Sequence, residues 1–94
     1  MLKNEFNELS EEYLNDIHNR INILRNDIKN KNIYSIMLFI HKIKGSGASF
    51  GFPELTDVGR KMEDVVKDID WKKLNSHFNE LIEIFNKISG KKYA

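Results

Sequence analysis

Residues 33–69, IYSIMLFIHKIKGSGASFGFPELTDVGRKMEDVVKDI, contain two apolar patterns that are separated by one break. In both patterns, apolar or small residues recur at alternating steps of three and four, which places them on one face of a helix. The first pattern consists of Ile33, Ile36, Ile40, Ile43 and Gly47, and the second of Leu55, Val58, Met62, Val65 and Ile69. Between them, Gly51-Phe52-Pro53 ends one helix and begins the next, because proline is well tolerated at the start of a helix and poorly tolerated later. The stretch predicts helices over about 33–50 and 53–68.

The flanking sequence predicts one further helix on each side. An earlier stripe consists of Leu14, Ile17, Ile21, Leu24 and Ile28, and a later one of Leu74, Phe78, Leu81, Phe85 and Ile88. Ser10 is expected to cap the first of these helices, with Leu9 packing on Leu14 beside the cap. Asp70 is expected to cap the last helix, which should end near Gly90. With spans of about 10–30 and 71–89 added, the chain is predicted to be all-α: one domain over residues 1–94, folded as an antiparallel up-and-down four-helix bundle.

The composition narrows the class of protein. The 94 residues include no cysteine, which excludes disulfides, zinc–thiolate sites and a cysteine nucleophile. Basic and acidic residues nearly balance, for a formal charge of +1, and both signs are dispersed along the chain. Nucleic-acid binding normally depends on a concentrated basic face, so no nucleic-acid partner is expected. Because the chain has neither a long apolar run nor a secretion signal, we expect a cytoplasmic protein with no membrane partner. We also expect a monomer.

The outward face of the helix over 33–50 differs from an ordinary solvated surface. At about 100° per residue, His41 falls well away from the core-facing stripe and should be exposed. The same side or its flank also carries Tyr34, Met37, Leu38, Lys44, Gly45 and Ala48. An exposed apolar surface around a reactive group indicates a docking site.

Two glycines in this helix need an explanation other than helix stability. Each costs about 1 kcal/mol relative to alanine inside a helix. Gly45 lies one turn beyond His41, where a side chain would crowd a group attached to the imidazole or a protein pressed against it. Gly47 lies inward and is expected to let the third or fourth helix pack closely.

His41 and Lys44 are three residues apart and therefore neighbours on the helix surface. A histidine side chain is largely neutral and nucleophilic near neutral pH, and the Lys44 ammonium can reach a phosphoryl group on it. Taken alone, this pair fits an ordinary surface histidine better than a phosphoryl carrier.

The run over residues 41–55, HKIKGSGASFGFPEL, resembles the signature of histidine-containing phosphotransfer (HPt) domains. In that signature, His, any residue, an apolar residue, Lys, Gly and Ser or Ala precede a small-residue stretch, a Gly and a Leu. The similarity continues through Gly59 and Met62-Glu63, where the family usually has an apolar residue followed by Glu or Gln. The resemblance implies a phosphohistidine at His41, with Lys44 compensating the charge and Gly45 leaving the space.

The same resemblance assigns two residues of the third helix. Glu63 matches a polar residue that comes near the imidazole, which implies that it orients the ring; a plain surface carboxylate is the alternative. Gly59 matches a small residue, which implies a role in helix packing.

The resemblance also implies a reaction and its partners. The phosphoryl group would pass by in-line displacement between His41 and an aspartate of a response-regulator receiver domain, within a phosphorelay that includes a sensor or hybrid histidine kinase. The chain would need no cofactor, Mg²⁺ being expected only on the receiver, and it has no glycine-rich nucleotide loop for a kinase activity of its own. The candidate docking contacts are Tyr34, Met37, Leu38, Lys42, Gly45 and Ala48.

Three alternatives stay open at this point. The bundle can be a docking adaptor that no longer carries phosphoryl, which the intact His41, Lys44 and Gly45 argue against. It can be a domain of a larger hybrid or chemotaxis-type kinase, although Met1 favours a free-standing chain. A generic helical adaptor or nucleic-acid binder is disfavoured by the dispersed charge. His18 and His77 lack the spacing of metal ligands, so they are expected to be surface histidines, and no metal site is predicted.

Overall fold

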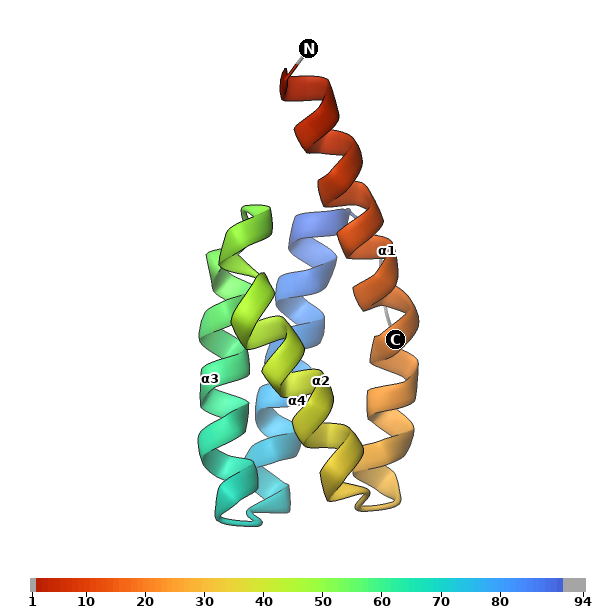
Figure 1. Ribbon diagram of the computed structural model, residues 1–94. Coiled ribbons are helices and arrows are strands. Elements are labelled where there is room, and N and C mark those ends of the chain that lie inside the picture. Colours follow the sequence, from red (N-terminus) through yellow and green to blue (C-terminus); the bar gives the residue numbers. More distant parts are fainter. Residues whose placement is uncertain (1, 91–94) are drawn as a thin grey trace.

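The computed structural model describes residues 2–90, and side chains from residue 8 to residue 90. Its elements are α1 (Leu2–Lys29), α2 (Ile33–Ser46), the 3-10 turn η1 (Ala48–Phe50), α3 (Pro53–Lys67) and α4 (Trp71–Ser89). Successive helices run in opposite directions, and the start of α1 extends beyond the other three (Figure 1). The predicted all-α antiparallel four-helix bundle is therefore confirmed. No helix in the described part of the chain has the length and apolar character needed to cross a bilayer.

The predicted apolar stripes form the core. The largest fully buried side chains are Ile17, Ile21 and Leu24 of α1, Ile36, Ile40 and Ile43 of α2, Leu55, Val58 and Met62 of α3, and Leu74, Leu81 and Phe85 of α4. Burying one side chain of this kind contributes about 1.5–3 kcal/mol. The buried surface is wider than the stripes, because Tyr13, Phe39, Val66 and Ile82, each next to a stripe position, are buried too. Each helix packs on two neighbours, and one stripe is too narrow to cover both.

Three predicted helix ends are confirmed. Pro53 is the first residue of α3, where its missing N–H leaves no bond unmade. Asp70 caps α4, its Oδ1 accepting a hydrogen bond of 3.1 Å from the Lys73 N–H. Gly90 ends α4 with a φ of 73°, in the left-handed region that favours glycine.

The start of α1 was predicted too late in the chain. The helix begins at Leu2, so Ser10 lies inside it and caps nothing. The Ser10 side chain is buried, and its hydroxyl donates to the carbonyl oxygen of Phe50 at 3.3 Å. Leu9 is 54% exposed, and without a cap between Leu9 and Leu14 the expected staple does not apply. Residues 2–9 contain neither glycine nor proline, so nothing stops the helix before Ser10.

The second helix was predicted too long. α2 ends at Ser46, and the chain continues through Gly47 into η1 and then Gly51, whose φ of 93° reverses its direction. Gly47 lies so close to α3 that an added Cβ would be 2.8 Å from the backbone nitrogen of Thr56. The prediction that Gly47 allows close packing is confirmed, with α3 as the neighbour. Beyond it, the Phe50 ring stacks on Tyr13 of α1 at 4.4 Å between centroids.

The assignment of Ile69 to the third stripe is wrong. α3 ends at Lys67, and Ile69 has a φ of 54° and is 57% exposed. The chain reverses here, with the Ile69 N–H bonded to the carbonyl of Val66. A left-handed backbone is unfavourable for a β-branched residue. The turn that places α4 antiparallel to α3 overrides the apolar spacing at this position.

Candidate functional site

His41 lies on the outer face of α2, and its side chain is exposed, as the helical register predicts. The neighbouring Ile40 and Ile43 are fully buried, which fixes the rotation of α2 and turns His41 to solvent. Among the side chains described, none forms a hydrogen bond with the imidazole. The exposed ring can therefore be reached by a group that approaches from solution.

Gly45, one turn further along α2, is exposed and borders open space. A Cβ added there would meet no heavy atom within 4 Å. Packing within the fold does not require a glycine at this position, although glycine weakens a helix by about 1 kcal/mol relative to alanine. The gap predicted beside His41 is present.

A hollow of about 250 Å³ lies between α2 and α3 next to His41. It is lined by Tyr34, Met37, Leu38, Ile40 and His41 of α2 and by Glu63 and Val66 of α3. Tyr34, Leu38 and Met37 are 77%, 55% and 43% exposed, so three large apolar side chains are clustered at the surface here. Three of the predicted docking contacts thus surround one depression beside the histidine.

Lys44 reaches from α2 to α3, where its Nζ donates to Glu63 Oε1 at 2.9 Å. Lys67 Nζ lies 3.8 Å from the same oxygen, one helical turn along α3. The hydrogen bond from Lys44 lowers the pKa of the Glu63 carboxyl, and the charge of Lys67 acts in the same direction. Glu63 is therefore ionised at neutral pH, and it holds the lysine that the sequence places beside His41.

Gly59 sets the distance between the two helices at this point. A Cβ added to Gly59 would lie 3.0 Å from Ile43 Cγ1 and 3.1 Å from the backbone nitrogen of Lys44. α3 can therefore approach the backbone of α2 directly opposite Lys44. The packing role predicted for Gly59 is confirmed.

The sequence profile of the Hpt domain matches residues 8–89, which is most of the chain. The chain belongs to the Hpt domain family. No curated protein and no solved structure shows a significant match. Membership of this family implies histidine phosphotransfer in a phosphorelay.

Glu63 of this Hpt domain has a partner that the sequence did not indicate. It lines the same hollow as His41, but among the described side chains its hydrogen bond comes from Lys44 and not from the imidazole. The orienting role that the resemblance implies for Glu63 stays a prediction. Lys67 was overlooked, although its position four residues after Glu63 is a helical ion-pair spacing that the sequence displays.

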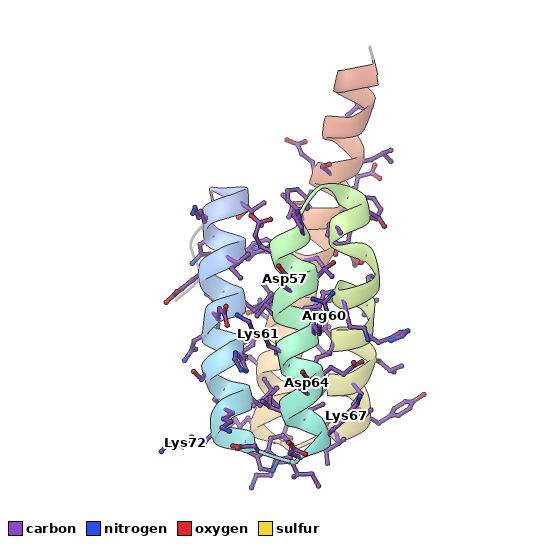
Figure 2. The ribbon with its side chains drawn as sticks, turned by 90° about the vertical axis from the view of Figure 1, so that its left-hand side faces the viewer. Asp57, Arg60, Lys61, Asp64, Lys67 and Lys72 are labelled. Carbon is purple, nitrogen blue, oxygen red and sulfur yellow. The ribbon has the colours of Figure 1, made fainter. Side chains whose placement is uncertain are left out.

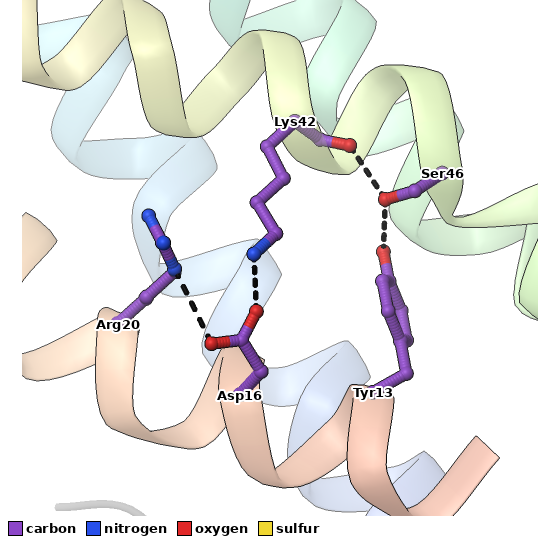
Figure 3. A network of polar contacts seen from close by, with 5 residues as sticks. All are labelled: Tyr13, Asp16, Arg20, Lys42 and Ser46. Carbon is purple, nitrogen blue, oxygen red and sulfur yellow. Dashed lines mark hydrogen bonds and ion pairs between the residues drawn. The ribbon is translucent and has the colours of Figure 1, made fainter. Parts of the chain in front are cut away.

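Lys42 of the Hpt domain is directed to α1 (Figure 3), and it is not among the residues that line the hollow. Its Nζ is paired with Asp16 Oδ2, and the other Asp16 oxygen is 3.4 Å from Arg20 Nε. The pairing with Lys42 lowers the pKa of the Asp16 carboxyl. Lys42 was predicted as a docking contact. The structure places its ammonium group in a contact between α1 and α2, and the docking role stays a prediction.

A hydrogen-bonded chain continues this contact toward the end of α2 (Figure 3). Tyr13 Oη and Ser46 Oγ are 2.9 Å apart, and the Ser46 hydroxyl donates to the carbonyl oxygen of Lys42 at 2.6 Å. The sequence does not reveal this set, because it depends on how α1 is rotated against α2. Its effect is to join the last turn of α2 to α1.

Ala48 is exposed, but it lies in η1 and not on α2. Its N–H donates to Thr56 Oγ1 of α3 at 2.9 Å. The outward strip of α2 predicted to run from Tyr34 to Ala48 therefore ends at Gly45, because the helix stops at Ser46.

The two other histidines were expected to be surface residues, and both are only partly exposed. The His18 ring is partly buried and lies 5.9 Å from the Phe85 ring, between centroids. His77 Nδ1 is 3.1 Å from Glu80 Oε1 on α4. Within the described residues, no group of three or more His, Asp or Glu side chains is arranged to hold a metal ion.

Proposed function

We propose that this Hpt domain carries a phosphoryl group on His41 and exchanges it with the aspartate of a response-regulator receiver domain in a multistep phosphorelay. The observation that carries the proposal is the exposed imidazole of His41 beside the open position at Gly45. Exposure gives the nucleophile access to a protein-bound phosphoryl group. The missing side chain leaves room for that group and for the surface that delivers it.

The transfer requires no co-reactant from this chain. A ring nitrogen of neutral His41 attacks phosphorus with its lone pair, and the P–O bond to the aspartyl carboxylate breaks in line with the new P–N bond. The aspartate leaves as a carboxylate with the bonding electrons. The reverse reaction returns the phosphoryl group to the receiver by the same path.

The phosphoryl group brings negative charge to α2, and Lys44 is placed to compensate it. Its ammonium is a compact cation with three donors on a flexible stem. We assign Mg²⁺ and the acidic pocket to the receiver, and to this chain the nucleophile, the lysine and the docking surface.

The docking surface of the proposal is the hollow between α2 and α3. Its rim residues Tyr34, Met37 and Leu38 give the apolar centre expected of a transient protein interface. A sensor or hybrid histidine kinase would supply the phosphoryl group through a receiver. The proposed carrier acts as a monomer in the cytoplasm, either free-standing or as a domain of a larger kinase.

The test is phosphoryl transfer from a panel of receiver domains that are charged with radiolabelled acetyl phosphate. The wild-type chain should acquire label that is acid-labile and stable to base, as expected for phosphohistidine. His41→Gln should acquire none, whereas His77→Gln, the same change on α4, should be labelled like the wild type. Label that persists on His41→Gln excludes His41 as the carrier. Binding of receivers without any label on the wild type would indicate a docking adaptor.

A further inference from the structure

Resting on the function proposed for His41, we infer that Glu63 is a positioning residue. Glu63 holds Lys44 in an ion pair while His41 is unphosphorylated, and it pairs with Lys67 when Lys44 turns to the phosphoryl group. The three charged residues would act as an exchange of ion-pair partners between α2 and α3. This assigns to Glu63 a role through Lys44, in place of a direct bond to the imidazole.

The arrangement of the three side chains supports an exchange. One oxygen of Glu63 is approached by two ammonium groups, with Lys44 Nζ at 2.9 Å and Lys67 Nζ at 3.8 Å. The Glu63 side chain is 21% exposed and that of Lys44 is 32% exposed, whereas that of Lys67 is 61% exposed. Glu63 is therefore the most enclosed of the three charges. Lys67 has the most freedom to close the remaining distance.

The charge of the phosphoryl group supplies the driving force. A protein phosphoryl group carries a charge of about −1.5 to −2 near neutral pH, which exceeds the single charge of Glu63. Lys44 follows His41 by three residues on α2, so both anions are within its reach. The more highly charged group should attract Lys44 more strongly.

Without a substitute, that movement would leave Glu63 uncompensated. A carboxylate enclosed beside a phosphoryl group would repel it, which would disfavour the phosphorylated state. Lys67 is already next to Glu63 and can take up the full ion pair. In this way the site accepts the negative charge of the phosphoryl group while every anion keeps a cation.

The measurement is the equilibrium of phosphoryl exchange between one receiver domain and the full chain. In the wild-type background, Glu63→Gln should raise the share of phosphorylated chain about two- to fivefold, because Lys44 no longer has to leave a partner. A change of this size corresponds to the free energy of a partly exposed ion pair. Lys67→Gln should lower that share about twofold.

A matched control is available on the same helix. Lys61 lies on the side of α3 that faces α4, where its Nζ is 3.0 Å from Glu80 Oε2, whereas Lys67 lies on the side that faces α2 (Figure 2). Lys61→Gln removes the same charge from α3 without touching Glu63. It should leave the exchange equilibrium unchanged, and a shift equal to that of Lys67→Gln would overturn the role of Lys67.

A double-mutant cycle separates positioning from plain charge. If Glu63 acts through Lys44, the effect of Glu63→Gln should vanish in a Lys44→Gln background. If Glu63 repels the phosphoryl group directly, the effect will be the same in both backgrounds, and the inference is overturned. Failure of the proposed function looks different, since the wild type would then carry no label on His41. The ¹⁵N signals of the lysine ammonium groups give a second readout: phosphorylation should shift both Lys44 and Lys67, and an unmoved Lys67 contradicts the exchange.

Discussion

Lys42 and Lys44 lie two residues apart on α2, and each is paired with a carboxylate on a different neighbouring helix. Lys42 is paired with Asp16 of α1, and Lys44 with Glu63 of α3. In both pairs the lysine lowers the pKa of the carboxyl group. The surroundings differ, because Glu63 shares a hollow with His41, whereas Asp16 and Lys42 line another hollow with Tyr13 and Phe50. Both pairs therefore join two helices, but the Lys44–Glu63 pair also lies where the proposed reaction occurs.

The two sides of α2 also differ in how closely the neighbouring helix approaches. On the α3 side, Gly47 and Gly59 allow backbone and side-chain atoms to within about 3 Å of where a Cβ would lie. On the α1 side, Tyr13 and Ser46 fill the space with a side-chain hydrogen bond. The α3 contact is therefore sensitive to added volume, and the α1 contact to the loss of polar groups.

The largest effect is expected from neutralising Lys44, with the same change at Lys42 as the control. Lys44→Gln should slow transfer to His41 about 10- to 100-fold, because a hydrogen bond to a charged group is worth about 1.5–3 kcal/mol. Lys42→Gln should change the rate about twofold or less, as for an exposed ion pair. Rapid-quench transfer from one phosphorylated receiver measures both rates. Equal losses in the two variants would show that general positive charge, and not Lys44, supports the reaction.

A smaller effect is expected when single methyl groups are added to α2 and α3. Gly59→Ala should destabilise the fold by about 1–3 kcal/mol, because the new Cβ would press on the backbone of Lys44. Gly45→Ala is the matched control and should stabilise the fold by up to about 1 kcal/mol, since the added Cβ meets open space. Urea unfolding of both variants tests this. A stabilising Gly59→Ala would contradict the close approach of α3.

The smallest effect is expected from acid, which should weaken both pairs. Asp16 and Glu63 have pKa values below their ordinary ranges, chiefly because of the hydrogen bonds from Lys42 and Lys44. Such a group contributes stability that is complete above its unfolded pKa and is lost as the pH falls through its folded pKa. Stability should therefore decline below about pH 4, where unfolded carboxyl groups take up protons.

Single variants separate the two contributions to this decline. In Asp16→Asn and in Glu63→Gln the substituted group no longer titrates, so each variant should lose part of the decline. Denaturant unfolding from about pH 7 to about pH 3 provides the comparison. If both variants lose stability as steeply as the wild type, neither pair is coupled to folding.

The sequence was sufficient to predict what depends on one helix at a time. The apolar stripes predicted the core, and the register of α2 predicted that His41 and Gly45 face outward while Ile40 and Ile43 face inward. The Asp70 cap and the proline at the start of α3 could also be predicted, because these signals are local.

What the sequence could not provide depends on how helices are rotated against one another. The pairing of Asp16 with Lys42 needs the angle between α1 and α2, and the bond from Ser10 to Phe50 needs the chain reversal after Gly47. Ser10 has the chemistry of a helix cap, and its burial against η1 decided its role instead. Glu63 was placed near the site by the resemblance, but its choice of Lys44 as partner depends on the approach that Gly59 permits.

The open space at Gly45 has a consequence for protein engineering. A design procedure that scores the isolated chain would replace this glycine, since nothing in the fold opposes a side chain there and the helix would gain from one. A library selected for heat resistance alone would also lose the glycine. A library selected for signalling would keep it if the open position at Gly45 admits the receiver. Comparing the two selections at position 45 would show how much helix stability the fold gives up for access to its histidine.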